Sequence, residues 1–248
     1  MKLNEFFALY SKVAVAFSGG VDSSYLLYSA KRNGAEVKAY YVKSAFQPQF
    51  ELDDAVKLSK ELNIPMKILN VDVLSSNIIA KNPIDRCYYC KRIIFEAIKQ
   101  AAKEDGFSIL LDGTNASASK EDRPGMRATE ELSVLSPLKE CGLTKEEIRR
   151  LSCEAGLFTW NKPAYACLAT RISTGEAITE KKLKTTEAAE DFLFSLGLTD
   201  FRVRTVGNDA KIQASLNDIG KVLENRDKIC HKLKQYYSNV LLDLEVRE

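Results

Sequence analysis

Strand-length runs of apolar residues alternate with helix-like segments along the first half of the chain. Residues 13–17 (VAVAF) form a continuous apolar run, which is typical of a strand buried on both faces. The same pattern continues with expected strands at residues 36–42, 66–71 and 108–111, and with expected helices at residues 21–33, 51–62 and 89–104. Strands separated by helices of about 10 to 15 residues predict an α/β fold, with a parallel sheet and helices on both of its faces.

The pattern changes in the second half of the chain. Residues 144–147 (TKEE) form a capping box in front of an expected helix at 148–155, and a long irregular segment follows. Beyond it we expect a helix at residues 180–195, a hairpin at 201–214, a helix at 216–236 and a strand at 240–246. We therefore predict a small C-terminal α+β domain and place the boundary near Ile172, which gives domains of residues 1–172 and 173–248.

Composition narrows the class of protein. The 248 residues include 45% hydrophobic and 28% charged residues with 12 Gly and 6 Pro, which excludes a disordered, collagen-like or low-complexity chain. No window approaches 18 apolar residues and no signal-peptide cleavage site is visible, so we expect a cytoplasmic protein that does not span a membrane. The net charge of +2 disfavours a dedicated nucleic-acid-binding domain.

The strongest motif is SGGVDS at residues 18–23, directly after the first expected strand and at the start of the first helix. A helix N-terminus offers unpaired N–H groups, and two glycines let the backbone approach a polyanion closely. Residues 112–115 (DGTN) follow the fourth expected strand and add polar groups at the carboxyl edge of the sheet, where ligands of such folds bind. The segment is neither a Walker loop nor a G-x-G-x-x-G motif, and the alternative is a glycine-rich turn without a ligand.

The six cysteines need separate explanations, because stable disulfides are rare in the cytoplasm. Cys87 and Cys90 stand at the start of an expected helix, but a single C-x-x-C pair without a second pair disfavours structural zinc. The pair is either a dithiol redox switch or, with Cys167 from the irregular segment, the ligand set of an iron–sulfur cluster that leaves one iron open. The remaining cysteines are expected to be small buried hydrophobic residues: Cys141, Cys153 and Cys230.

SGGVDS resembles the signature of the PP-loop ATP pyrophosphatases. The resemblance implies that the expected α/β fold is the fold of this family. That resemblance implies binding of ATP, attack by a substrate oxygen on the α-phosphate, and release of pyrophosphate. It assigns the phosphates to Ser18, Gly19, Gly20, Asp22 and Ser23, with Asp22 also catalytic and near Mg²⁺. We add Gly113, at the carboxyl edge of the sheet, to this nucleotide site.

Several longer segments resemble one PP-loop family, the LarE-type ATP-dependent sulfur transferases. They include PIDRCYYCKR, DGTNASASKEDRPGMRA, WNKPAYACLATRI and the later RVR. The resemblance implies that the chain adenylylates a carboxylate of pyridinium-3,5-dicarboxylic acid mononucleotide and converts it to a thiocarboxylate for the nickel-pincer nucleotide cofactor. Cys167 matches a catalytic cysteine that gives up its own sulfur in part of the family. Because Cys87 and Cys90 are also present, we favour the subtype in which three cysteines bind a 4Fe-4S cluster.

The same resemblance assigns further residues and partners. Arg202 and Arg204 would bind the substrate phosphate, with a solvated basic edge as the alternative, and Glu190 would lie at a metal, although Glu187 would serve as well. Three arginines are unranked candidates for active-site cations: Arg123, Arg127 and Arg171. Trp160 either stacks on a ring of the ligand or has an ordinary packing role. A sulfide donor and a homo-oligomer, with hexamers known in the family, are implied as well.

Two other functions remain open from the sequence. A tRNA-thiolating enzyme also combines a PP-loop with three cysteines around an iron–sulfur cluster, but it needs a basic surface for its RNA. A non-catalytic adenine-nucleotide-binding module is the second alternative. Pyrophosphate release separates this module from both enzymes.

Overall fold

The computed structural model describes residues 1–118 and 124–247. By their internal contacts these residues form two compact units, and each is described by itself. The first unit contains Met1–Val73 and Asp85–Ala164, and the second contains Leu74–Ile84 and Tyr165–Glu248. The domain boundary near Ile172 stays a prediction.

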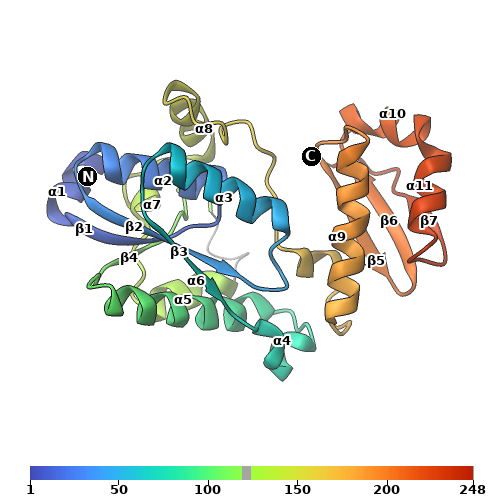
Figure 1. Cartoon of the computed structure of the whole chain (residues 1–248), viewed down its shortest axis with the longest axis horizontal. Helices are drawn as coiled ribbons and strands as arrows, with labels where there is room; N and C mark the ends of the chain where they lie inside the picture. Colours follow the sequence, from blue (N-terminus) through green and yellow to red (C-terminus); the bar gives the residue numbers. More distant parts are fainter. Residues whose placement is uncertain (119–123, 248) are drawn as a thin grey trace. The chain divides into compact units, whose positions relative to one another are not determined.

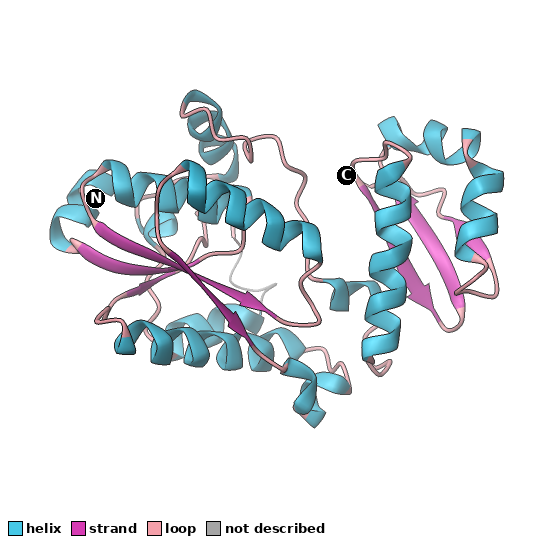
Figure 2. Cartoon of the chain, viewed as in Figure 1, coloured by secondary structure: helices cyan, strands magenta, loops and turns pink. Residues whose placement is uncertain are grey.

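The first unit is built on a four-stranded parallel sheet (Figures 1 and 2). Its strands stand in the order β3-β2-β1-β4 and have these bounds: β1 Lys12–Ala16, β2 Glu36–Lys43, β3 Met66–Asn70 and β4 Leu110–Leu111. Each neighbouring pair is parallel; in the register of β1 and β2, for example, Val13 lies beside Val37. The α/β class and all four expected strands are confirmed.

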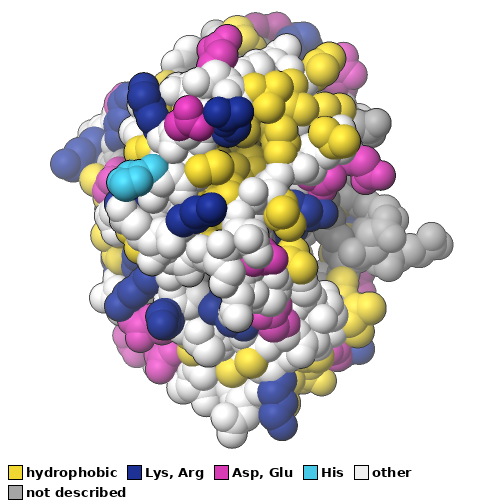
Figure 3. Space-filling model, turned by 90° about the vertical axis from the view of Figure 1, so that its right-hand side faces the viewer, with side chains coloured by type: hydrophobic (Ala, Val, Ile, Leu, Met, Phe, Trp, Pro, Cys, Tyr) yellow, Lys and Arg dark blue, Asp and Glu magenta, His cyan; other side chains and the backbone are white. Residues whose placement is uncertain are grey.

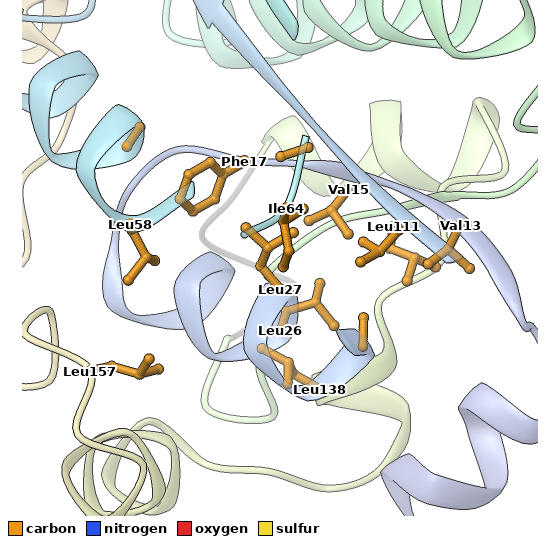
Figure 4. Packing of buried hydrophobic residues seen from close by; sticks show 14 of the residues in the cluster. Val13, Val15, Phe17, Leu26, Leu27, Leu58, Ile64, Leu111, Leu138 and Leu157 are labelled. Atoms are coloured by element: carbon orange, nitrogen blue, oxygen red, sulfur yellow. The ribbon is translucent and has the colours of Figure 1, made fainter. Parts of the chain in front are cut away.

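Alternate residues of the central strands enter two different hydrophobic cores. Val13 and Val15 of β1 pack in one core with residues of α2 (Val21–Arg32) and α3 (Gln49–Glu61), as Figure 4 shows for Leu26, Leu27 and Leu58. Ala14 lies in the other core, with Phe95 and Ile98 of α5 (Arg86–Glu104). This alternation explains why the strands read as continuous apolar runs, and it confirms helices on both faces of the sheet.

Shorter helices complete the first unit: α1 Leu3–Leu9, α6 Pro124–Glu131, α7 Pro137–Glu140 and α8 Lys145–Glu154. The expected capping box begins α8. The N–H of Glu147 donates to the Thr144 hydroxyl at 3.3 Å, and the N–H of Thr144 donates to the Glu147 carboxylate at 2.8 Å. The helices α1, α6 and α7 were not expected from the sequence.

A charged cluster ties the end of α5 to the sheet. The Asp105 carboxylate accepts hydrogen bonds from Lys38 at 2.8 Å, from the Tyr40 hydroxyl at 2.9 Å and from Lys67 at 3.2 Å. The hydrogen bonds from Lys38 and then Tyr40 lower the pKa of Asp105 to about 2.

The second unit joins helices to a three-stranded sheet in the order β5-β6-β7. Besides η1 (Val73–Ser75) at its edge and α4 (Asn77–Ala80), its elements are η2 Leu168–Arg171, α9 Glu180–Ser195, β5 Phe201–Val206, β6 Asp209–Ala214, α10 Leu216–Glu224, α11 Arg226–Leu233 and β7 Val240–Leu242. β5 and β6 form the expected antiparallel hairpin, and β7 pairs parallel to β6. Leu193 of α9, Phe201 and Ile212 of the hairpin, and Ile229 of α11 share one core.

The prediction of a single helix at residues 216–236 is wrong. α10 and α11 meet at Asn225, whose backbone has φ −100° and ψ 13°. The Asn225 side chain and its backbone N–H both donate to the carbonyl of Lys221, at 3.0 and 3.1 Å. None of the described helices is long and apolar enough to cross a membrane.

Candidate functional site

The SGGVDS turn lies between the carboxyl end of β1 and the start of α2. The Ser18 and Ser23 hydroxyl oxygens are 3.0 Å apart, and the N–H of Gly20 donates to the Ser18 hydroxyl at 3.4 Å. Gly19 has a φ of +72°, and a Cβ there would lie 3.0 Å from the carbonyl oxygen of Glu51, so the position requires glycine. No side chain caps α2 at Gly20, which leaves the first N–H groups of the helix available to an anion.

Asp22 lies in the first turn of α2, and its two carboxylate oxygens have different surroundings. Oδ2 pairs with Lys145 at 2.6 Å. Oδ1 is buried and has no hydrogen-bond partner within the described residues. A buried carboxylate oxygen without a donor is costly unless a cation approaches it, so this atom fits the Mg²⁺ that accompanies ATP.

The end of β4 packs directly on this turn. The buried Asp112 carboxylate accepts from the N–H of Thr114 at 3.1 Å and from the Ser136 hydroxyl at 2.7 Å, which fixes the chain after the strand. A Cβ on Gly113 would lie 2.9 Å from the N–H nitrogen of Ser23. Glycine at 113 therefore lets the two polar segments approach, and the structure brings Gly113 beside the turn, as expected.

A buried ion pair organises the second unit. Glu190 of α9 and Arg171 of η2 are each 1% exposed, and the Arg171 Nε and Nη2 atoms donate to Oε1 and Oε2 of Glu190 at 2.9 and 3.1 Å. The N–H of Val203 donates to Oε1 at 2.9 Å, and the Tyr165 hydroxyl donates to Oε2. Burial alone lowers the pKa of Arg171, but the hydrogen bonds and the charge of Glu190 raise it above its ordinary value.

The same arginine fixes the backbone beside Cys167. The Arg171 Nη1 atom donates to the carbonyl of Ala166 at 2.7 Å and to that of Cys167 at 3.4 Å. Glu190 as a metal ligand stays a prediction, and a cation there would have to displace one of its four hydrogen-bond donors.

Arg202 and Arg204 occupy alternate positions of β5 near this pair. The Arg202 guanidinium lies 4.7 Å from the centre of the Tyr165 ring, and Arg204 donates to the carbonyl of Thr170 at 2.7 Å. Arg202 is 4% exposed, so the alternative of a solvated basic edge is wrong for it. Burial, and then the charge of Arg171, lower the pKa of Arg202 to about 10, and Asp200 lies 3.9 Å from its Nη1 atom. Such a position suits an anion, and the phosphate-binding role of both residues stays a prediction.

The three cysteines predicted to bind a cluster are divided between the units. Cys87 and Cys90 lie in the first turns of α5 in the first unit, Cys87 exposed and Cys90 half-buried. Cys167 is half-buried at the start of η2 in the second unit. In the described parts of the chain, no three His, Cys, Asp or Glu residues are arranged to hold a metal ion. The cluster therefore stays a prediction.

The other cysteines differ in burial. No disulfide joins any of the six. Cys141 and Cys230 are half-buried, but Cys153 is exposed, so its expected burial is wrong. The buried side of α8 runs through Ile148 and Ser152, and the next residue points outward.

Comparison with known proteins identifies the family of the chain. A family model described as queuosine biosynthesis protein QueC matches residues 12–86, from β1 to the start of α5. The pyridinium-3,5-bisthiocarboxylic acid mononucleotide synthase of Lactiplantibacillus plantarum is 32% identical over 94% of this chain and 86% of its own length. The chain belongs to the LarE family of PP-loop ATP-dependent sulfur transferases.

Two further relatives of this LarE-family chain show the range of similarity. An uncharacterized protein of Synechocystis is 32% identical over 98% of the chain and 92% of its own length. A tRNA-specific 2-thiouridylase of Pseudothermotoga lettingae is 26% identical over 61% of the chain and 54% of its own length. The predicted LarE-type identity and the predicted sulfur transferase class are confirmed, whereas the three-cysteine subtype stays a prediction.

The remaining candidates of the LarE-family chain have defined surroundings, with one exception. Arg127 of α6 stacks 3.7 Å from the centre of the Tyr88 ring and pairs with Glu131 at 3.4 Å. Trp160 is 42% exposed, and its carbonyl accepts a hydrogen bond from α8. Arg123 lies outside the described residues.

Two lysines at the nucleotide loop were missed by sequence reasoning. Lys145 pairs with Asp22, and Lys162 donates to the carbonyl of Gly19 at 3.4 Å. Both residues are distant from the loop in sequence and outside its motif. The available signal was the place of Lys162 inside the irregular segment that we expected to be functional.

Proposed function

We propose that this chain uses ATP to activate a carboxylate of pyridinium-3,5-dicarboxylic acid mononucleotide and replaces one carboxylate oxygen by sulfur, in the synthesis of the nickel-pincer nucleotide. The substrate class is supported by the printed name of the Lactiplantibacillus plantarum relative. The observation that carries the proposal is the PP-loop itself, in which unpaired helix N–H groups and the unpartnered Oδ1 of Asp22 lie together.

The first half-reaction needs a bound triphosphate and a cation. A carboxylate oxygen of the substrate attacks the α-phosphorus of ATP, the bond between the α- and β-phosphates breaks, and pyrophosphate leaves with the electron pair. The N–H groups at the start of α2 and the hydroxyls of Ser18 and Ser23 would hold the phosphates. Oδ1 of Asp22 would hold the Mg²⁺ that offsets their charge.

The second half-reaction forms the carbon–sulfur bond. A sulfur nucleophile attacks the acyl carbon, the acyl–oxygen bond breaks, and AMP leaves. Either sulfide from an external donor supplies the sulfur, or the Cys167 thiolate forms a thioester with the substrate. In the second case loss of the Cα proton breaks the Cβ–Sγ bond of Cys167, which releases the thiocarboxylate and leaves dehydroalanine. We propose that Cys87, Cys90 and Cys167 bind a 4Fe-4S cluster; the position of the first two at a helix start supports thiolate chemistry.

The second unit would bind the substrate nucleotide. Arg202 and Arg204 occupy alternate positions of β5, so their guanidinium groups lie on the same face of the sheet. A phosphate monoester placed there would offset the positive charge of the two side chains and accept hydrogen bonds from their planar guanidinium groups.

Pyrophosphate release tests the nucleotide site. The protein is incubated with Mg²⁺-ATP and the dicarboxylic nucleotide, and pyrophosphate is measured for wild type, Asp22→Asn and the control Asp227→Asn. Asp227 lies in α11 with its side chain 87% exposed. We expect substrate-dependent release from wild type and the control, and at least a tenfold loss in Asp22→Asn (about 1.4 kcal/mol). Equal rates in all three proteins would show that the site assignment is wrong.

Iron content tests the cluster. We expect about four irons per chain after anaerobic reconstitution of wild type, and loss of iron in Cys87→Ala, Cys90→Ala and Cys167→Ala. Cys153→Ala is the matched control, because Cys153 is also exposed but belongs to α8. No iron in wild type would leave Cys167 as the sulfur donor.

We also propose that the protein is a cytoplasmic homo-oligomer. Figure 3 looks at the side that carries α10, α11 and β7 and shows apolar side chains gathered over part of it. Leu216, Leu223 and Leu244 are 73%, 60% and 84% exposed. Exposed apolar side chains support association between copies, and light scattering measures the resulting mass.

A further inference from the structure

The ammonium group of Lys162 lies against the glycine turn of the nucleotide loop. Its Nζ atom pairs with Asp54 of α3 at 2.6 Å and donates to the carbonyl of Gly19 at 3.4 Å. It also lies 5.4 Å from the centre of the Phe50 ring, and its side chain is only 16% exposed. The irregular segment therefore places the ammonium group of Lys162 beside the turn at Gly19.

The backbone that carries this lysine is held by a second cation. The two terminal nitrogens of Arg149, on α8, donate to the carbonyls of Trp160 and Lys162, each at 2.7 Å. The N–H of Lys162 also donates to the carbonyl of Thr159 at 3.1 Å. One planar guanidinium thus fixes two carbonyls of the same turn, and Lys162 is held at the loop before any ligand binds.

We propose that Lys162 is a phosphate-binding residue of the nucleotide site and that Arg149 is its positioning residue. The inference rests on the proposed use of ATP at the PP-loop. An ammonium has three donors, so Lys162 can turn from the Gly19 carbonyl and Asp54 toward a phosphate without movement of the turn. Asp54 neutralises the lysine when no nucleotide is bound, and its own negative charge opposes a polyphosphate.

A purely structural role of the Lys162–Asp54 ion pair would give a different result. If Lys162 and Asp54 only tie the irregular segment to α3, removal of either charge lowers stability and leaves nucleotide affinity unchanged. If Lys162 binds phosphate, only the removal of the lysine charge lowers nucleotide affinity. Lys162→Met weakens binding, whereas Asp54→Asn leaves it equal or tighter.

The test is titration calorimetry of the full chain with Mg²⁺-ATP, pyrophosphate and adenosine, beside a thermal unfolding curve for every variant. For Lys162→Met we expect a loss of about tenfold or more in affinity for ATP and pyrophosphate, from the loss of a charge-assisted hydrogen bond, with adenosine unaffected. Lys162→Arg should recover part of the loss. Arg149→Gln should weaken ATP binding more than Arg150→Gln, which removes only the surface pair with Glu154.

The possible results are distinct. The inference would be overturned if Lys162→Met kept the wild-type affinity for ATP while Lys162→Met and Asp54→Asn lowered the melting temperature equally. The pair would then be purely structural. Wild-type protein that binds neither ATP nor pyrophosphate would instead contradict the proposed function.

Discussion

The buried pair of Arg171 and Glu190 gives a quantitative prediction about the second unit. Both side chains are 1% exposed, and the carboxylate receives hydrogen bonds from Arg171, Val203 and Tyr165. Glu190→Gln leaves the guanidinium without its counter-charge, and Arg171→Met leaves the carboxylate without its cation. Each variant therefore retains one buried charge that has lost its partner.

The expected magnitude follows from this burial. Removal of one member of a buried, hydrogen-bonded ion pair costs about 3–5 kcal/mol. The pair of Arg150 and Glu154 has the same charges but side chains 61% and 58% exposed, so Arg150→Met should cost about 1 kcal/mol or less. The double variant removes both buried charges, and it should cost less than the sum of the single variants by about 1–3 kcal/mol.

Urea unfolding followed by circular dichroism gives these free energies, and amide hydrogen exchange in α9 and β5 reports on the second unit itself. We expect large losses for the single variants, faster exchange in α9 and β5, and a clear coupling energy. Additive losses, each no larger than that of Arg150→Met, would refute the account of this pair.

Three further predictions concern the first unit. The pKa of Asp105 is lowered from 3.8 to about 2, so its contribution to stability is present above about pH 4 and is lost as the pH falls through 2; the stability gap between wild type and Asp105→Asn should close over that range in acid titrations. Thr144→Ala removes one half of the capping box and should cost about 1 kcal/mol in urea unfolding. Gly113→Ala places a Cβ 2.9 Å from the Ser23 nitrogen, and we expect a loss of about 1–3 kcal/mol with weaker ATP binding measured by calorimetry.

Much of the first unit could be predicted because its signals are local. The apolar run of β1 and the two glycines that follow it determine a strand, a turn and a helix start within about a dozen residues. The capping box at Thr144 is equally local and appears in the structure as expected. Parallel strands end at one sheet edge, so Gly113 could be placed beside the loop from the order of elements alone.

The contacts of the charged residues could not be predicted in the same way. Asp22 and Lys145 are 123 residues apart in sequence, and no spacing rule connects them. Glu190 could be expected near an active site by resemblance, but its hydrogen bonds to Arg171 and Val203 depend on tertiary packing. The break at Asn225 was missed because the apolar pattern continues through it and neither glycine nor proline stands there.

The central claim is ATP-dependent replacement of oxygen by sulfur on a carboxylate. The most direct measurement is mass spectrometry of pyridinium-3,5-dicarboxylic acid mononucleotide after anaerobic incubation with the reconstituted protein, Mg²⁺-ATP and sulfide, with pyrophosphate and AMP quantified in the same samples. The account predicts a product with sulfur in place of one oxygen, and one pyrophosphate and one AMP for each sulfur transferred. ATP cleavage without any sulfur in the nucleotide, or an unchanged nucleotide with no pyrophosphate, would contradict it.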